Sequence, residues 1–152
     1  MELVSAPKPV GPIAIISDDA VIIGIQFESK LKRSSPKDHP DVLKRAAQQM
    51  KEYLSGSRKA FDLPLEKKGT RFQASVWKAL SQVPYGKSKT YGDVATKIGR
   101  PKAFRAVGNA VGKNPFPIVI PCHRIVASGG IGGFSGGSGL PVKRWLRDRE
   151  SV

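Results

Sequence analysis

The segment from Asn114 to Arg124 constrains the chain more than any other stretch. It reads Asn-Pro-Phe-Pro-Ile-Val-Ile-Pro-Cys-His-Arg and holds three prolines. Proline fixes its own φ and restricts the residue before it, so a stiff and extended segment is expected. The apolar run 116–120 predicts a short buried strand or an extended core segment. Such a segment would deliver Cys122 to one place with little freedom.

Cys122 is the single cysteine of the chain, and one of the two histidines, His123, follows it directly. A lone cysteine in an arbitrary sequence is more often a small buried core residue than a reactive one. Here a neighbouring imidazole and the cation Arg124 favour the thiolate, so we interpret Cys122 as reactive. One cysteine excludes an internal disulfide framework. No zinc-ligand cluster is visible in the sequence, and we expect no metal or cofactor.

The net charge of +14 is unevenly distributed along the 152 residues. Residues 1–66 carry ten Lys or Arg against nine Asp or Glu, whereas residues 67–152 carry sixteen against three. Basic charge confined to one half is typical of a face that binds a polyanion. Nucleic acid is favoured over an anionic membrane because no basic amphipathic helix stands apart from a core. The alternative is a basic surface that only serves solubility. We divide the chain into a scaffold domain, 1–66, and a DNA-binding domain, 67–152.

The sequence shows neither a membrane helix nor a signal peptide. No apolar run approaches the roughly 18 residues of a membrane helix. The first residues lack the basic region of a signal peptide. We therefore expect a soluble, cytoplasmic protein with no membrane contact.

The first half predicts a small α/β scaffold. The β-branched runs 12–16 and 20–27 are typical of a hairpin. A helical period follows from Asp38, a possible N-cap, and Gly56 ends it. His39 lies in loop-like sequence and is interpreted as a surface residue.

The second half predicts helices. Thr70 begins a capping box, and Thr90 begins a second helix that stops at Gly99. A third helix follows almost at once and places Phe104 on its apolar face. Two short helices joined by a tight glycine turn are typical of a helix-turn-helix, although many helical hairpins bind nothing. A last helix begins at Pro141.

The outward side of the third helix carries basic residues, and its other residues are mostly small. Gly108 and Gly112 cost helix stability, which indicates that something approaches the backbone closely. The alternative is a solvated face with tolerated glycines. The three-and-four spacing places five residues on this side: Lys102, Arg105, Ala106, Asn109 and Lys113.

The run Ile-Pro-Cys-His-Arg, with Asn-Pro before it and seven glycines in 128–139 after it, resembles the O6-alkylguanine-DNA alkyltransferases. The similarity extends from about Thr70 onward. The first half matches only as a small α/β domain, without the zinc ligands that some relatives carry. The resemblance implies an α/β N-terminal subdomain and a mainly helical C-terminal subdomain with a helix-turn-helix. It also implies that the alkyl group of O6-alkylguanine, and of O4-alkylthymine, is transferred once and irreversibly to Cys122 after nucleotide flipping.

The resemblance further implies roles in catalysis. A base must take the thiol proton, and His123 would act through a water because neighbours in an extended chain point to opposite sides. A carboxylate would orient the imidazole. The sequence alone leaves Asp148 and Glu150 equally open, and the resemblance selects Glu150. Tyr91 matches the donor to the leaving guanine ring, and Asn114 the hinge that braces the helix-turn-helix.

Substrate and DNA contacts come from the same resemblance. The backbone of Cys122 and Ile125 would accept from the guanine amine, and the backbone of Ser135 would donate to O6. Pro117 and Phe134 would wall the pocket, and Lys143 would hold its loop. Phe134 replaces the usual tyrosine, and Ser138-Gly139 lengthens the loop.

The implied partner is double-stranded DNA containing O6-alkylguanine, bound through its minor groove by a monomer that is nucleoid-associated when on DNA. Arg105 would fill the space of the extruded nucleotide. The matching DNA-binding set is Arg105, Lys102, Ala106, Asn109, Lys113 and Thr90.

Two alternatives remain open on the sequence. A non-catalytic lesion-binding protein of the same fold would lack the cysteine. A cysteine hydrolase would need an oxyanion hole and a histidine separated from its cysteine.

Overall fold

The first part of the chain is a three-stranded antiparallel sheet covered by one helix. The computed structural model describes residues 1–27, 40–134 and 139–151. The predicted hairpin is present as β2 (Ile13–Asp18) and β3 (Val21–Phe27), and the strand order is β1-β2-β3. The edge strand β1 (Glu2–Val4) was not expected from the sequence. Its three residues are too few to show an alternating pattern.

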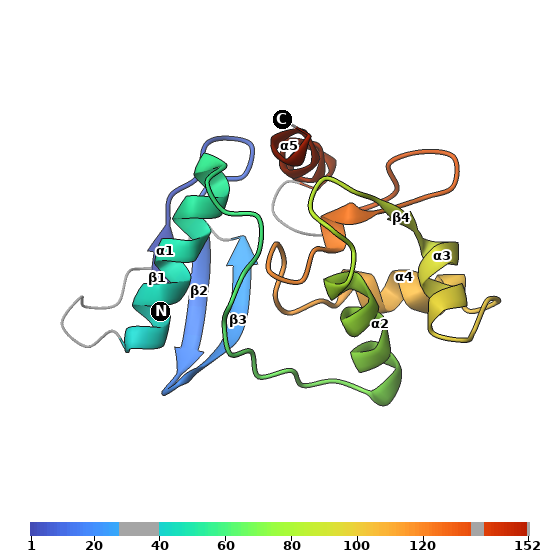
Figure 1. Ribbon diagram of the computed structural model, residues 1–152, viewed down its shortest axis with the longest axis horizontal. Coiled ribbons are helices and arrows are strands. Elements are labelled where there is room, and N and C mark those ends of the chain that lie inside the picture. Colours follow the sequence, from blue (N-terminus) through green and yellow to red (C-terminus); the bar gives the residue numbers. More distant parts are fainter. Residues whose placement is uncertain (28–39, 135–138, 152) are drawn as a thin grey trace.

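Helix α1 (Asp41–Ser55) lies against this sheet (Figure 1). Its N-cap is Pro40, two residues later than the predicted N-cap Asp38, which is outside the described residues. Pro40 stands at the N-cap without a side-chain bond, and the helix ends at Gly56, in the left-handed conformation, as predicted. The buried positions repeat at helical spacing: Val42, Leu43, Ala46, Ala47, Gln49, Met50, Tyr53 and Leu54.

The edge of β3 joins the sheet to the rest of the chain. The connecting segment lies along this edge, where Ile22 donates to the Pro64 carbonyl and accepts from Glu66 N–H. Further along, Ile25 N–H donates to the carbonyl of Pro115, at 3.0 Å. The segment that leads to Cys122 is therefore hydrogen-bonded directly to the N-terminal sheet.

The second part is mainly helical. Helix α2 (Arg71–Ser81) carries the predicted capping box of Thr70 with Gln73. Helix α3 (Tyr91–Lys97) begins with a second capping box, Thr90 with Asp93. A short parallel pair, β4 (Lys89–Thr90) with β5 (Ile125–Val126), holds the start of α3 beside the cysteine segment.

A tight turn joins α3 to α4 (Phe104–Gly112). Gly99 adopts a φ of 78°, and the N–H groups of Gly99 and Arg100 donate to the carbonyls of Thr96 and Ala95. This Schellman pattern ends α3 and reverses the chain. Lys102 lies in the connecting turn and not on α4, so the predicted start of the third helix was too early.

The segment 116–120 is not a strand. Ile120 N–H donates to the Phe116 carbonyl at 2.8 Å, and Ile118 has a φ of 73°. The left-handed conformation is rare for a β-branched residue. Pro117 has no N–H to give to a ladder, so the chain turns here. Phe116, Ile118 and Ile120 are nonetheless buried, which confirms the core position of the segment.

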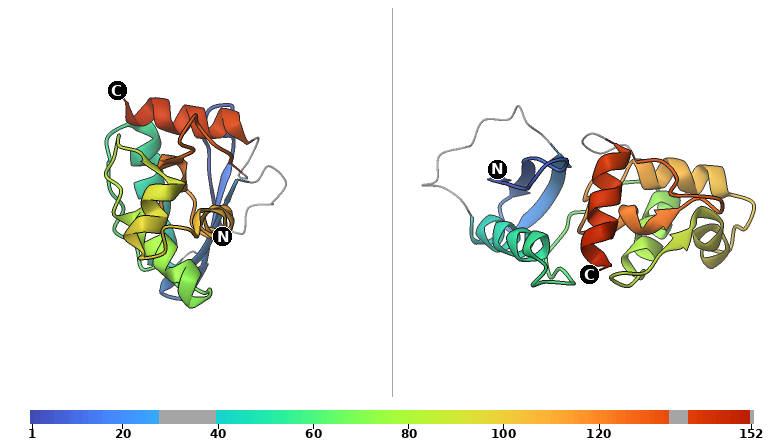
Figure 2. Two further views of the ribbon diagram at one scale, coloured as in Figure 1. Left: turned by 90° about the vertical axis from the view of Figure 1, so that its right-hand side faces the viewer. Right: turned by 90° about the horizontal axis from the view of Figure 1, so that it is seen from above.

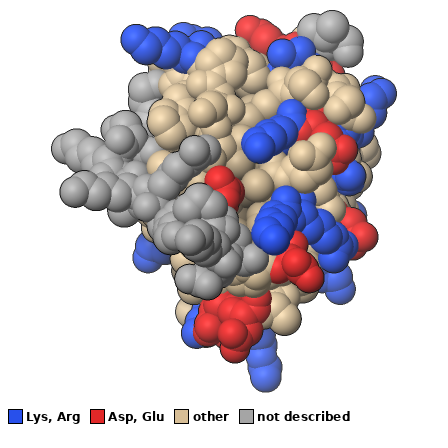
Figure 3. All heavy atoms as spheres, turned by 90° about the vertical axis from the view of Figure 1, so that its left-hand side faces the viewer, with Lys and Arg blue, Asp and Glu red and all other residues tan. Residues whose placement is uncertain are grey.

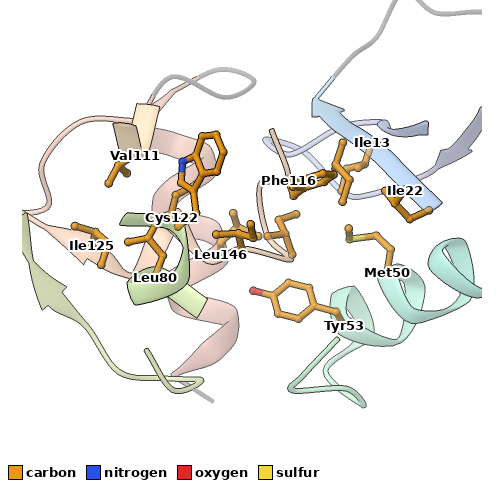
Figure 4. Close-up of a cluster of buried hydrophobic side chains, with 14 of the residues drawn as sticks. Ile13, Ile22, Met50, Tyr53, Leu80, Val111, Phe116, Cys122, Ile125 and Leu146 are labelled. Carbon is orange, nitrogen blue, oxygen red and sulfur yellow. The ribbon is translucent and has the colours of Figure 1, made fainter. Parts of the chain in front are cut away.

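Helix α5 (Leu140–Glu150) lies at the junction of the two parts (Figures 1 and 2). Its Leu146 is fully buried, whereas Trp145 is only partly buried. One cluster of apolar side chains runs across the junction, with Met50 and Tyr53 on one side and Leu80 and Ile125 on the other (Figure 4). The two parts therefore share a core.

The outer face of the first part carries mixed charge (Figure 3). Lys and Arg side chains alternate with Asp and Glu on the face seen there, in keeping with the near-neutral count for 1–66. Within the described ranges, no helix is long and apolar enough to cross a membrane. His39 and Ser135 lie outside the described residues.

Candidate active site and DNA interface

Cys122 lies at a pocket of about 370 Å³ in the C-terminal part. Its side chain is nearly buried, with 7% of its surface exposed. Helix α4, the start of α3, the cysteine segment and the glycine-rich loop all supply walls. The lining residues are Tyr91, Gly108, Val111, Gly112, Asn114, Pro117, Cys122, Gly133 and Phe134.

The residues Cys122–Arg124 form a turn of 3-10 helix and not the extended chain that was expected. Burial raises the pKa of the Cys122 thiol above its ordinary value. Several groups oppose this rise in pKa: the Asn114 amide, the charge of Lys143, and the N–H groups of Cys122 and His123. The thiol therefore needs a base before it can react at neutral pH.

His123 points away from the pocket into the core. The ring is fully buried, and Nε2 lies 2.6 Å from Oε2 of Glu150. Burial lowers the pKa of His123, while Glu150 opposes this effect. Nδ1 is buried without a hydrogen-bond partner among the described residues. A neutral imidazole with its proton on Nε2 has a bare nitrogen at Nδ1.

Glu150, at the end of α5, is buried and is contacted by five hydrogen-bonding groups from four residues. Burial alone would raise the pKa of Glu150, but the bonds from His123, Arg124 and Tyr53 hold it well below its ordinary range. Gly86 N–H adds a longer contact, at 3.3 Å. Asp148, the alternative left open by the sequence, is exposed on the same helix. The structure thus places Glu150, and not Asp148, beside His123.

Arg124 does not face the thiol. Its Nε and Nη2 donate to the two oxygens of Glu150 at 2.8 and 3.0 Å, and Nη1 donates to the Val83 carbonyl at 2.7 Å. The prediction that Arg124 favours the thiolate was therefore wrong, because the guanidinium does not point to the sulfur. The guanidinium is used to hold the carboxylate.

Tyr53 also contacts the site, although no sequence signal pointed to it. Its hydroxyl donates to Oε2 of Glu150 at 2.6 Å, from helix α1 of the other part of the chain. In the sequence it is only one more apolar position in the period of α1. No local pattern relates it to a carboxylate 97 residues away.

Asn114 braces the turn before the cysteine. Its Nδ2 donates to the Ile120 carbonyl at 2.7 Å, and its Oδ1 accepts from Phe116 N–H at 2.9 Å. These bonds hold the turn in which Ile118 is left-handed. Asn114 directly follows Lys113, the C-cap of α4, so it connects that helix with the cysteine segment.

Lys143 is fully buried beneath the glycine-rich loop. Its Nζ donates to the carbonyls of Ile125 and Gly133, at 2.6 and 3.0 Å. Burial lowers the pKa of Lys143 to about 8. The amine thus connects Ile125, the residue after the cysteine turn, to the loop residue Gly133, which lines the pocket.

Tyr91 and Phe134 both line the pocket. Burial raises the pKa of Tyr91, so its hydroxyl stays a donor. Gly132 has a φ of 76°, and a Cβ there would lie 3.2 Å from the Tyr91 ring, so glycine is required. The Phe134 ring packs edge-on against Phe27 of β3, at 6.0 Å between centroids.

The outward side of α4 carries the predicted basic set. Arg105, Ala106 and Asn109 are exposed there, and Lys102 and Lys113 are exposed just outside the helix ends. Thr90 uses its hydroxyl to cap α3. Phe104 was expected to be buried, but 52% of its surface is exposed. It lies in the first turn of α4, before the helix enters the core.

Gly108 and Gly112 are not required by internal packing. A Cβ at Gly112 would meet nothing within 4 Å, and one at Gly108 would only touch Tyr91 at 3.9 Å. Both residues line the pocket. Steric contacts within the described residues therefore do not explain glycine at either position. Within the described ranges, no group of three or more His, Cys, Asp or Glu could hold a metal ion.

The fold and site together define a small two-part protein whose single cysteine lies at a pocket lined by helix α4 and is followed by a histidine paired with a buried carboxylate. Residues 5–67 match the family model of the 6-O-methylguanine DNA methyltransferase ribonuclease-like domain. Residues 71–152 match the model of its DNA binding domain. The chain belongs to this family, that of the methylated-DNA–protein-cysteine methyltransferases, and it is an enzyme of that activity.

Relatives and solved structures agree. The methylated-DNA–protein-cysteine methyltransferase of Methanosarcina acetivorans is 40% identical over 144 residues, which cover 91% of each chain. That of Haemophilus influenzae is 41% identical over 96% of this chain and 84% of its own length. The crystal structure of Mycobacterium tuberculosis OGT in complex with DNA has a TM-score of 0.83 and 36% identity, over 98% of this chain and 91% of that one. The chain is thus a DNA alkyl-repair protein whose partner is DNA.

Proposed function

We propose that the protein repairs O6-alkylguanine, and O4-alkylthymine, in double-stranded DNA by a single transfer of the alkyl group to Cys122. The observation that carries this is the position of Cys122 at a 370 Å³ pocket, with the His123–Glu150 pair directly behind it. We propose the domain division 1–66 and 67–152, the second part binding DNA. A monomer suffices, because one chain supplies every residue of this site.

The transfer step needs two proton movements. The thiol proton of Cys122 passes through a water to Nδ1 of His123, and the imidazolium is stabilised by Glu150. The sulfur then attacks the alkyl carbon in line. The S–C bond forms as the C–O6 bond breaks, and the electron pair goes to the purine. Tyr91 hydroxyl gives a proton to the departing ring nitrogen.

The remaining pocket residues fix the base. Pro117 and Phe134 enclose its faces, and the carbonyls of Cys122 and Ile125 accept from the exocyclic amine. Ile125 already accepts one bond from Lys143, and a carbonyl oxygen has a second lone pair. We propose that Lys143 holds this carbonyl and the loop in place. We propose that the backbone of Ser135, which lies outside the described residues, donates to O6.

The base reaches the pocket by leaving the duplex, at a cost of a few kcal/mol. We propose that α4 enters the minor groove and Arg105 fills the vacated stack. The helix backbone approaches the DNA closely because three of its residues are small: Ala106, Gly108 and Gly112. The DNA strands are contacted by Lys102, Asn109, Lys113 and Thr90. Binding energy from these contacts offsets the extrusion. Because a thioether is a poor leaving group, no step restores the thiol.

The test is an intact-mass measurement after incubation with duplex DNA that contains O6-methylguanine. We expect a permanent gain of one methyl group on Cys122, and none on Cys122→Ser, which should bind the DNA within a few-fold of the parent. No gain by the parent would indicate a lesion-binding protein. Turnover of a small ester would indicate a hydrolase.

A further inference from the structure

The hydroxyl of Tyr53 reaches the site from the N-terminal part. The side chain is fully buried, and its ring projects from α1 with the oxygen toward the C-terminal half (Figure 4). The oxygen lies 2.6 Å from Oε2 of Glu150 and 3.4 Å from Nε2 of His123. It therefore sits at the junction between the carboxylate and the imidazole.

The direction of these hydrogen bonds follows from proton counts. A phenol has one proton, and an ionised carboxylate at 2.6 Å is a stronger acceptor than an imidazole nitrogen at 3.4 Å. The proton is therefore given to Glu150, and the lone pairs of the Tyr53 oxygen are left toward Nε2 of His123. Nε2 then faces two acceptors, the carboxylate and the phenol oxygen. A ring nitrogen in that setting carries the hydrogen, and Nδ1 is left bare.

Packing alone does not account for the hydroxyl. The Tyr53 ring contacts Phe61 and Tyr85, at 5.5 and 6.2 Å between centroids, and a phenylalanine would fill the same volume. Burying a hydroxyl costs free energy unless it is bonded. The charged groups around the pair are Glu150, Arg124 and Arg147. The two arginines lower the pKa of His123 and so disfavour imidazolium. The Tyr53 oxygen adds a second acceptor for the hydrogen on Nε2.

We propose that Tyr53 is a positioning residue for Cys122 chemistry: its oxygen and Glu150 together hold His123 in the tautomer whose bare Nδ1 takes the thiol proton. This rests on the proposed role of His123 as the base. It also gives the N-terminal part a direct share in the reactivity of the cysteine, since α1 supplies the hydroxyl. The docking of α1 then decides whether the imidazole is held correctly.

The test combines a tautomer measurement with thiol reactivity. The chain has two histidines, so His39→Gln leaves one, and ¹⁵N–¹H multiple-bond spectra report which nitrogen of His123 carries the proton. We expect the Nε2–H form in this parent. Tyr53→Phe should shift the His123 nitrogen resonances, because Nε2–H loses one of its two acceptors and keeps only the Glu150 carboxylate. It should also slow iodoacetamide alkylation of Cys122 by about 3- to 10-fold, the worth of one hydrogen bond.

Tyr85→Phe is the matched control. It removes a hydroxyl from the ring beside Tyr53, where the bond is to the Arg149 carbonyl at 3.3 Å. It should leave both the spectrum and the alkylation rate unchanged. An unchanged spectrum and rate in folded Tyr53→Phe, or an equal change in Tyr85→Phe, would overturn the proposal.

A second variant covers the case in which Tyr53→Phe does not fold. Replacement of Tyr53 by 3-fluorotyrosine keeps the shape but weakens the oxygen as an acceptor, and it should change the His123 nitrogen shifts in the same direction. Parent-like shifts would again overturn the proposal. Neither readout uses alkylated DNA. Failure of methyl transfer from DNA would therefore reject the proposed function independently of this result.

Discussion

Oε2 of Glu150 and Nε2 of His123 lie 2.6 Å apart, although the two residues belong to elements separated by the whole glycine-rich loop. Glu150 is 6% exposed and His123 is fully buried. A carboxylate in this position favours imidazolium, which burial alone disfavours. The pair is thus suited to accept a proton from a thiol that burial also holds protonated.

Glu150→Gln should slow alkylation of Cys122 by about 100-fold at neutral pH, the lower end of what acid–base catalysis contributes. Without the carboxylate the pKa of His123 falls further, so the thiolate forms only at higher pH and the rate profile moves to higher pH. The measurement is the rate of thiol alkylation against pH. Arg124 also loses its partner, which should cost about 3–5 kcal/mol of unfolding free energy.

Asp148→Asn is the control for this change, since Asp148 is exposed on the same helix. It should leave the profile in place. Overlapping profiles for Glu150→Gln and the parent, or a shift only in Asp148→Asn, would contradict the proposed relay from Cys122 through water and His123 to Glu150.

Asn114→Ala should raise the apparent pKa of Cys122, because the Asn114 side chain lowers the pKa of the thiol. It should also cost about 1–3 kcal/mol of stability, since the Ile120 carbonyl and Phe116 N–H lose their partner. Thiol titration and urea unfolding give the two quantities. Gln48→Ala removes an exposed amide on α1 and should change neither. If the thiol pKa of Asn114→Ala equals that of the parent, Asn114 serves only to brace the turn.

Arg105→Ala should slow repair of duplex DNA by about 10- to 100-fold, while reaction with free O6-benzylguanine stays within about 2-fold. The free base needs no extrusion, so only the duplex reaction requires a group to fill the stack. Single-turnover rates on both substrates are the measurement. Lys44→Ala, which removes an exposed charge on α1, should affect neither. Equal losses on both substrates would place Arg105 in a structural role.

Acidification should destabilise the protein in two steps. Burial holds the folded pKa of His123 below 6.5, so the unfolded chain binds more protons and stability falls as pH drops below that value. The folded pKa of Glu150 is held below 4.5, so a second loss follows at lower pH. Urea unfolding of His39→Gln at about pH 7.5, 5.5 and 3.5 measures both steps. Adding His123→Gln should abolish the upper step, and a persistent loss would assign it to other groups.

Much of the local structure follows from residues near one another in the chain. The two capping boxes at Thr70 and Thr90, the glycine stop at Gly99 and the β-branched hairpin are local signals, and each is present in the structure. Local hydrogen bonding and φ preference act over three or four residues, so a linear pattern can carry them. The family motif likewise predicts Cys122 as the alkyl acceptor without any tertiary information.

Other features depend on contacts that no window of sequence contains. The 116–120 segment turns because Asn114 and buried neighbours hold it, whereas its composition favours a strand. Arg124 is directed to Glu150 because the two meet only when α5 docks. Tyr53 joins them from the other side of the shared core. Charge pairing and burial depend on three-dimensional distance, so the sequence determined which groups exist, and the packing of α1 and α5 decided which of them act together.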